Sequence, residues 1–115
     1  MNKIILVVNN ESKRNEKEKF FIKKELQSIL NLYAKMVSNG SWKDYSFTSG
    51  TKEVSFDVYQ RASEKPVLRI LKNLKPKYFN EKYLIKDKNG AVLKKSENLN
   101  QLISKTSWNK LKLVK

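Results

Sequence analysis

Between Phe21 and Tyr45 the apolar residues recur with the period of an α-helix. They stand at Ile22, Leu26, Ile29, Leu30, Tyr33, Met36 and Val37. These positions follow one side of a helix, whereas a strand, with a period of two, cannot place them on one face. Gly40 follows the last of them and suits the left-handed conformation that ends many helices. The spacing predicts a long helix over about 21–39, packed on the rest of the chain.

The rest of the chain must supply the surface that covers this helix. With 115 residues, of which 39% are apolar, it can form one domain with a modest core. We expect a single domain over 1–115 in which the charged run 9–19 is a linker. The chain has no cysteine and no histidine. This excludes disulfides, thiolate nucleophiles, the usual zinc sites and the commonest general base.

After Gly40 apolar and polar residues alternate, which is typical of strands with one buried face. The alternation predicts strands around 45–47, 54–59, 67–72, 83–85 and 91–95. The Asn-Gly pair at 89–90 is the strongest hairpin signal in the chain. A turn over 62–64 would place Val58 opposite Leu68, Phe56 opposite Ile70, and Asp57 opposite Arg69.

The two ends of the sequence add shorter elements. Asn98 is expected to cap a short helix over about 98–105, with Gln101 completing a capping box. Residues 3–8 have the composition of a strand, and the alternation in 108–114 is compatible with a last edge strand. The predicted fold class is α+β: a mainly antiparallel sheet of four to six strands, with the long helix packed on one face and the short C-terminal helix at an end or on the same face.

Three segments resemble a known family. They are KKELQSILNLYAKMVSNGSWKDY, VSFDVYQRASEKPVLRI and YLIKDKNGAVLKKSENLNQLI, within about 21–104. In these segments the chain resembles a small family of alphaproteobacterial proteins that are catalogued as a domain of unknown function. Ile22 stands where the relatives have an aspartate, and lysines replace many of their arginines. The resemblance implies a fold and a lineage, and no activity.

The formal charge of +14 has two interpretations. Lysine outnumbers arginine 22 to 3, which fits the codon bias of an AT-rich genome and a merely solvated lysine surface. The distribution, however, is uneven: residues 65–115 carry 14 basic and 3 acidic groups, and residues 1–64 carry 11 and 8. Such a skew points to an anionic partner.

Catalysis finds little support in the residues. The candidate carboxylates lie on different predicted elements, and no helical spacing pairs two of them: Glu25, Asp44, Asp57 and Glu64. Gly40, Gly50 and Gly90 each stand alone at a turn, so no glycine-rich phosphate loop is possible. We expect no enzyme, no cofactor and no metal.

The hairpin from Arg61 to Arg69 is the first candidate site, because it holds two of the three arginines of a lysine-rich chain. The candidate binding edge consists of Tyr59, Arg61, Ser63, Glu64 and Arg69. Alternatively, Arg69 only pairs with Asp57, and Arg61 with Asp44 or Glu64. Val67, Leu71 and Tyr59 fall on the outer side of this hairpin, so something has to cover them. We favour cover from within the chain over a homodimer.

Two aromatic clusters are further candidates. A nucleic-acid patch would interleave stacking rings with cations at Lys72, Lys75, Lys77, Tyr78, Phe79 and Lys82. The alternative there is a lysine-rich loop with one ring tucked into the core. Trp42 and Tyr45 form either a binding ledge at the junction of helix and sheet, or a lid on the helix end followed by a core strand.

The residues favour a non-enzymatic binding module whose partner is a protein or a second copy. The alternative is sequence-nonspecific RNA or DNA binding through 65–115, with an enzyme third. Nucleic-acid binding requires Lys75, Lys77 and Lys82 on one face with Tyr78, and protein binding requires an apolar patch around Tyr59 and Leu71. The apolar run 4–8 is too short for a signal peptide or a membrane span, so we expect a cytoplasmic protein without a membrane partner.

Overall fold

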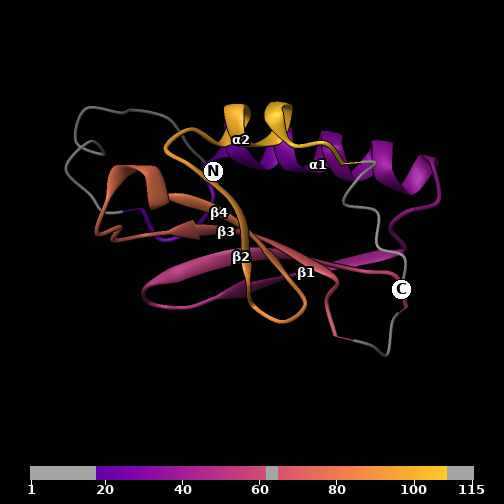
Figure 1. Cartoon of the computed structure of the whole chain (residues 1–115), viewed down its shortest axis with the longest axis horizontal. Helices are drawn as coiled ribbons and strands as arrows, with labels where there is room; N and C mark the ends of the chain where they lie inside the picture. Colours follow the sequence, from indigo (N-terminus) through magenta and orange to yellow (C-terminus); the bar gives the residue numbers. More distant parts are fainter. Residues whose placement is uncertain (1–17, 62–64, 109–115) are drawn as a thin grey trace, which may run out of the picture.

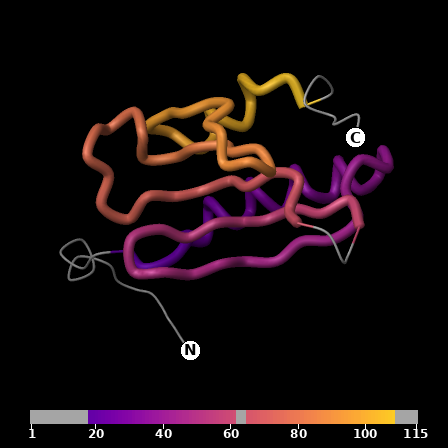
Figure 2. Tube along the Cα trace, turned by 60° about the horizontal axis from the view of Figure 1, so that its bottom comes forward, coloured from indigo at the N-terminus to yellow at the C-terminus, as the bar shows by residue number. Residues whose placement is uncertain are grey.

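The computed structural model describes residues 18–61 and 65–108. Its five strands form one antiparallel meander in which each strand pairs with its neighbours in sequence (Figure 2). The strands are β1 (Asp44–Ser49), β2 (Glu53–Tyr59), β3 (Leu68–Asn73), β4 (Tyr83–Asp87) and β5 (Val92–Ser96). The predicted α+β class is therefore confirmed.

Both helices lie on the same face of this sheet (Figure 1). The long helix α1 spans Lys23–Ser38, and the short helix α2 spans Leu99–Lys105. A single 3₁₀ turn, η2 (Phe79–Glu81), lies between β3 and β4. We call the helix-covered side the inner face of the sheet and the opposite side the outer face.

The predicted register of β2 and β3 is confirmed. Val58 pairs with Leu68, and Phe56 pairs with Ile70. Their side chains point to the inner face, and all four are buried. A shift by one residue would turn this apolar set to the outer face, and the position assumed for the turn selected this register among the remaining ones.

The core lies between the inner face and the helices. It combines aliphatic side chains of α1, α2 and the central strands with a cluster of rings from α1, β1 and β2. In that cluster Tyr33 packs edge-on against Tyr45, with 4.8 Å between the ring centroids. Phe56 is fully buried beneath both.

The buried side of α1 differs from the predicted one. The buried residues are Glu25, Ile29, Leu32 and Met36, so the helix is rotated relative to the expected apolar stripe. Ile22, Leu30 and Val37 were expected in the core, and each is about two-fifths exposed. The reason is polar: Glu25 takes an inward position because buried partners on β3 and β4 bind it.

The ends of the elements follow from short-range chemistry. Asn98 caps α2 as predicted, because its Oδ1 accepts a hydrogen bond from the Gln101 amide at 2.9 Å. The N-cap of α1 is Ile22, whose own amide donates to Glu25 Oε1 at 2.8 Å. Gly40 (φ 84°) and Gly90 (φ 86°) adopt the left-handed conformation that the predicted helix end and hairpin turn require.

Some predictions fall on residues beyond the described part of the chain. These are the strand over 3–8, most of the linker over 9–19, and the tail after Trp108. Trp108 itself is described and buried, with its ring 5.8 Å from that of Trp42. Within residues 18–61 and 65–108, no helix combines the length and apolar character that crossing a membrane takes.

Candidate functional site

The inner face holds a buried ionic cluster around Lys72 of β3. The side chain of Lys72 is completely buried. Its Nζ donates to Glu25 Oε1 at 2.8 Å, to Glu18 Oε1 at 2.6 Å and to the Phe20 carbonyl at 3.0 Å. An ammonium group has three N–H donors, so these partners satisfy all of them. Lys72 was predicted to be a surface cation of the nucleic-acid patch, and this prediction is wrong, because β3 extends to Asn73 and turns Lys72 inward.

The Glu25 carboxylate links the first turn of α1 to the sheet. Its Oε1 accepts from the Ile22 amide and Lys72, and its Oε2 accepts from the Tyr83 hydroxyl of β4. Burial, together with this bond to Glu25, raises the pKa of Tyr83. Every described donor in the cluster has a partner, so it is suited to holding the helix on the sheet rather than to binding a ligand.

The outer face carries a second buried carboxylate, Asp57 of β2, which is only 1% exposed. Thr48 Oγ1 donates to Asp57 Oδ2 at 2.6 Å, and Ser55 Oγ donates to Oδ1 at 2.7 Å. Arg69 Nε lies 3.4 Å from the same Oδ1, while the Arg69 side chain remains 43% exposed. The predicted pairing of Asp57 with Arg69 is confirmed. The carboxylate thereby contacts the guanidinium at Nε, while much of the Arg69 side chain remains accessible.

Next to Arg69 lies a basic pocket of about 420 Å³ between the β2–β3 and β4–β5 turns. Four cations line it: Lys65, Arg69, Lys86 and Lys88. Lys86 is the cross-strand partner of Arg69. The pocket also contains Asp87, whose Oδ1 accepts the amides of Asn89 and Ala91, each at 2.9 Å. We call this the turn pocket.

A second pocket of about 470 Å³ adjoins the turn pocket at Lys86, which lines both. Its other residues come from β4, β5 and η2: Glu81, Leu84, Val92, Leu93, Lys94 and Lys95. Lys95 Nζ lies 3.8 Å from Glu81 Oε2, so this pocket reaches η2. It also combines cations with partly exposed apolar side chains.

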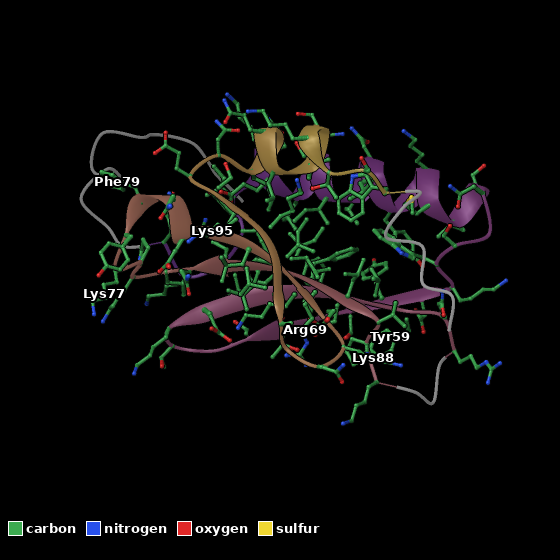
Figure 3. The ribbon with its side chains drawn as sticks, viewed as in Figure 1. Tyr59, Arg69, Lys77, Phe79, Lys88 and Lys95 are labelled. Carbon is green, nitrogen blue, oxygen red and sulfur yellow. The ribbon has the colours of Figure 1, made fainter. Side chains whose placement is uncertain are left out.

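Two exposed rings lie at η2. Tyr78 is 57% exposed and Phe79 is 80% exposed. Lys77 Nζ lies 5.8 Å from the centroid of the Tyr78 ring, which is within cation–π range. In Figure 3, Lys77 and Phe79 lie at one end of the molecule, Lys95 lies further in, and Arg69 and Lys88 lie beyond it. We call the six cations of this surface the outer-face cation track: Lys65, Arg69, Lys77, Lys86, Lys88 and Lys95.

Comparison with protein families matches residues 19–103 to the family described as Protein of unknown function (DUF2794). The chain belongs to the DUF2794 family. The match covers all five strands and α1, and it confirms the resemblance to a small domain of unknown function. Comparison with curated proteins and with solved structures found no match.

The predicted nucleic-acid patch of this DUF2794 chain is dispersed. Besides the buried Lys72, Lys82 lies over the ring of Tyr83, with 5.5 Å from Nζ to the centroid. Lys75 lines a different pocket with Glu18 and the β1–β2 turn. Lys77, Tyr78 and Phe79 are exposed side by side in sequence at η2. The alternative, one ring tucked into the core, is also wrong, because both rings are exposed.

The predicted binding edge is brought together only in part. Arg69 and Tyr59 both lie on the outer face, where the Tyr59 hydroxyl and Ser46 Oγ share a hydrogen bond of 3.0 Å. Arg61 is exposed, and Ser63 and Glu64 lie outside the described residues. Val67 and Leu71 are buried within the single chain, so their cover comes from the chain itself, as expected.

The predicted junction ledge is not formed. The Trp42 ring is buried at the end of α1, between Tyr33 and Trp108. Tyr45 is the second residue of β1, and its ring packs on Tyr33, Phe47 and Phe56. The Trp42 ring therefore covers the end of α1, and it is not accessible to a ligand.

Sequence reasoning missed most of the track. The missed cations are Lys65, Lys86, Lys88 and Lys95. One signal was present: if Ile70 faces Ile85 across β3 and β4, then Arg69 must face Lys86 on the other side of the sheet. Among the described residues, no group of three or more His, Cys, Asp or Glu side chains could hold a metal ion.

Proposed function

We propose that this DUF2794 protein binds single-stranded nucleic acid, without sequence preference, along the outer-face cation track. The observation that carries the proposal is the continuity of this surface. Two basic pockets share Lys86, and the second reaches Glu81 of η2, the turn that begins with the exposed Phe79. A cytoplasmic location belongs to the same proposal.

The chemistry of the track suits a single strand. Exposed lysines neutralise phosphates as point charges, and this interaction carries no sequence information. Phe79 and Tyr78 offer faces on which bases can stack, and stacking requires bases that are not paired in a duplex. Arg69 is the one arginine of the track, so the bidentate recognition of base edges that gives specificity has little support here.

The surface expected of a protein-binding module is missing from the described outer face. An apolar patch around Tyr59 and Leu71 would have favoured a protein partner. Leu71 is buried, and Tyr59 is half-buried with its hydroxyl bonded to Ser46. The geometry therefore favours the anionic ligand over the apolar one on this face.

Catalysis is not part of the proposal. The two buried carboxylates, Glu25 and Asp57, are each engaged by several donors from neighbouring elements. Both carboxylates therefore hold neighbouring side chains and elements in place. A binding role requires nothing further from either residue.

The test is a titration of the purified protein with single-stranded and duplex RNA and DNA at about 50 and 200 mM salt. For single strands, log affinity should fall with log salt by about 0.7 for each phosphate neutralised. Three phosphates therefore predict a slope of about −2 or steeper. Single strands should bind more tightly than duplexes of the same sequence.

A charge-reversal variant and a matched control locate the binding. Lys86→Glu/Lys95→Glu removes two cations from the middle of the track and should abolish binding. The control is Lys35→Glu/Lys105→Glu, which makes the same change in net charge at the last turns of α1 and α2. Equal losses in both variants would show that only net charge matters, and absence of binding at the lower salt would reject the proposal.

A second function, self-association, is favoured by a separate observation. The apolar side chains of Ile22, Leu30 and Val37 are exposed along one side of α1, and β1 is an edge strand among the strands of residues 18–61 and 65–108. A second copy that pairs at β1 could cover both. Sedimentation equilibrium should then detect a dimer that Leu30→Gln/Val37→Gln dissociates, whereas a monomer at all concentrations would exclude this function.

A further inference from the structure

The turn pocket differs from the rest of the track in its concentration of charge and in its place on the molecule. We infer that it binds a phosphate monoester, the terminal phosphate of a nucleic-acid strand. This inference rests on the proposed function and specifies which part of the strand occupies the pocket.

Neighbouring side chains restrict the position of the Arg69 guanidinium beside the pocket. Its Nε is held 3.4 Å from Asp57 Oδ1, and Asp57 is in turn fixed by the hydroxyls of Thr48 and Ser55. A guanidinium that is fixed on one edge loses little side-chain entropy when its remaining N–H groups bind an anion. Arginine binds phosphate oxygens bidentately, which lysine cannot do.

The charges in and beside the turn pocket match a monoester better than a diester. Four cations line it, and two carboxylates oppose them: Asp87 in the lining and Asp57 behind Arg69. Two positive charges therefore remain uncompensated among these six side chains. An internal phosphodiester carries one negative charge, whereas a phosphate monoester carries about −1.5 to −2 at neutral pH. A single monoester therefore balances the surplus, whereas a single internal phosphodiester leaves one positive charge uncompensated.

The position of the pocket fits the end of a strand. It lies between the β2–β3 and β4–β5 turns, at the end of the sheet and away from η2 (Figure 3). A strand whose bases stack near Phe79 and whose phosphates follow Lys95 and Lys86 would bring one terminus into this pocket. Its volume of about 420 Å³ leaves room for a phosphate and the sugar that bears it.

The experiment compares one single-stranded oligonucleotide in three forms: with a 5′-phosphate, with a 3′-phosphate and with hydroxyls at both ends. A nucleoside monophosphate is titrated separately. The proteins are the wild type, Lys86→Ala/Lys88→Ala, Arg69→Lys and the control Lys35→Ala. Arg69→Lys keeps the positive charge beside Asp57 and removes the fork, so it tests recognition with little risk to folding.

One terminal phosphate should tighten binding roughly tenfold, as expected for an added charge-assisted hydrogen bond. This gain should disappear in Lys86→Ala/Lys88→Ala, fall in Arg69→Lys and persist in Lys35→Ala. The nucleoside monophosphate should show the same order of variants, and that result alone would support the pocket even if strands failed to bind and the proposed function fell. Equal affinity for all three oligonucleotides, with no binding of the monophosphate, would overturn the inference and leave the proposed function intact.

Discussion

Lys72 and Arg69 lie three residues apart on β3, on opposite faces of the sheet, and have opposite roles. The ammonium of Lys72 is fully buried, and all of its donors are bonded to Glu18, Phe20 and Glu25. Arg69 is fixed on one side by Asp57, and 43% of its side chain remains exposed beside Lys86. The inner cation holds the fold together, and the outer cation is available to a ligand. The net charge of +14 therefore combines two different kinds of cation.

The largest expected effect comes from removing the buried cation of the inner face. Lys72→Met leaves the Glu25 carboxylate buried without its cation, which should lower the free energy of unfolding by about 3–5 kcal/mol. Urea denaturation measures this loss. The matched variant Lys86→Met, on the outer face of β4, should stay within about 0.5 kcal/mol of the wild type. Equal effects of the two substitutions would contradict the distinction between the faces.

Tyr83→Phe removes one hydrogen bond to the same carboxylate and should cost about 1.5–3 kcal/mol. It should also change the pH dependence of stability. The pKa of Tyr83 is raised in the folded state, so the stabilisation is complete below the unfolded pKa of about 10 and is lost as pH rises above it. Wild-type stability should therefore fall more steeply above about pH 10 than that of Tyr83→Phe. Identical slopes in thermal unfolding between about pH 9 and 11 would argue against the buried Tyr83–Glu25 bond.

Phe79→Ala tests whether the exposed ring contributes to strand binding without contributing to stability. Because Phe79 is 80% exposed, its removal should leave the free energy of unfolding within about 0.5 kcal/mol. Affinity for a single strand should nevertheless fall by about 1–3 kcal/mol, the usual cost of losing one stacked base. Fluorescence anisotropy with a labelled oligonucleotide measures this loss. The suitable control is Val37→Ala, because Val37 lies on the exposed side of α1. Phe47→Ala would not serve as a control, because the Phe47 ring packs in the core.

The smallest effect is expected from a single cation at the far end of the track. Lys77→Ala should reduce the salt slope for a single strand by about 0.7, the contribution of one phosphate contact. Lys35→Ala should leave the slope unchanged, because Lys35 lies on the helical side of the sheet. An equal reduction in both variants would mean that the strand has no preferred face.

Alternation of apolar residues predicted the fold because it reports directly on which face of each strand is buried. Together with the position assumed for the turn, it gave the pairing of Val58 with Leu68 and of Phe56 with Ile70. The same reasoning failed on α1, where Glu25 is buried and Leu30 is exposed. Counting apolar positions cannot recognise a carboxylate that is buried because a lysine on another element, 47 residues away in sequence, pairs with it.

The candidate site was harder to predict for a related reason. Tyr78, Phe79 and Arg69 were found because a local signal marks each of them: exposed rings among lysines, or an arginine in a lysine-rich chain. The rest of the track is assembled by pairing across strands, as Arg69 with Lys86 shows. Local composition gives Lys72 and Lys86 the same weight, and only the direction of each side chain separates them.

The most direct test of the central claim is to measure stability and strand binding together on Lys86→Ala/Lys88→Ala. The outer face is expected to bind and the inner face to stabilise, so the variant should lose most of its affinity for single strands at about 50 mM salt. Its free energy of unfolding should remain within about 0.5 kcal/mol of the wild type. Unchanged affinity with unchanged stability would contradict the claim, because the outer cations would then be ordinary solvated lysines.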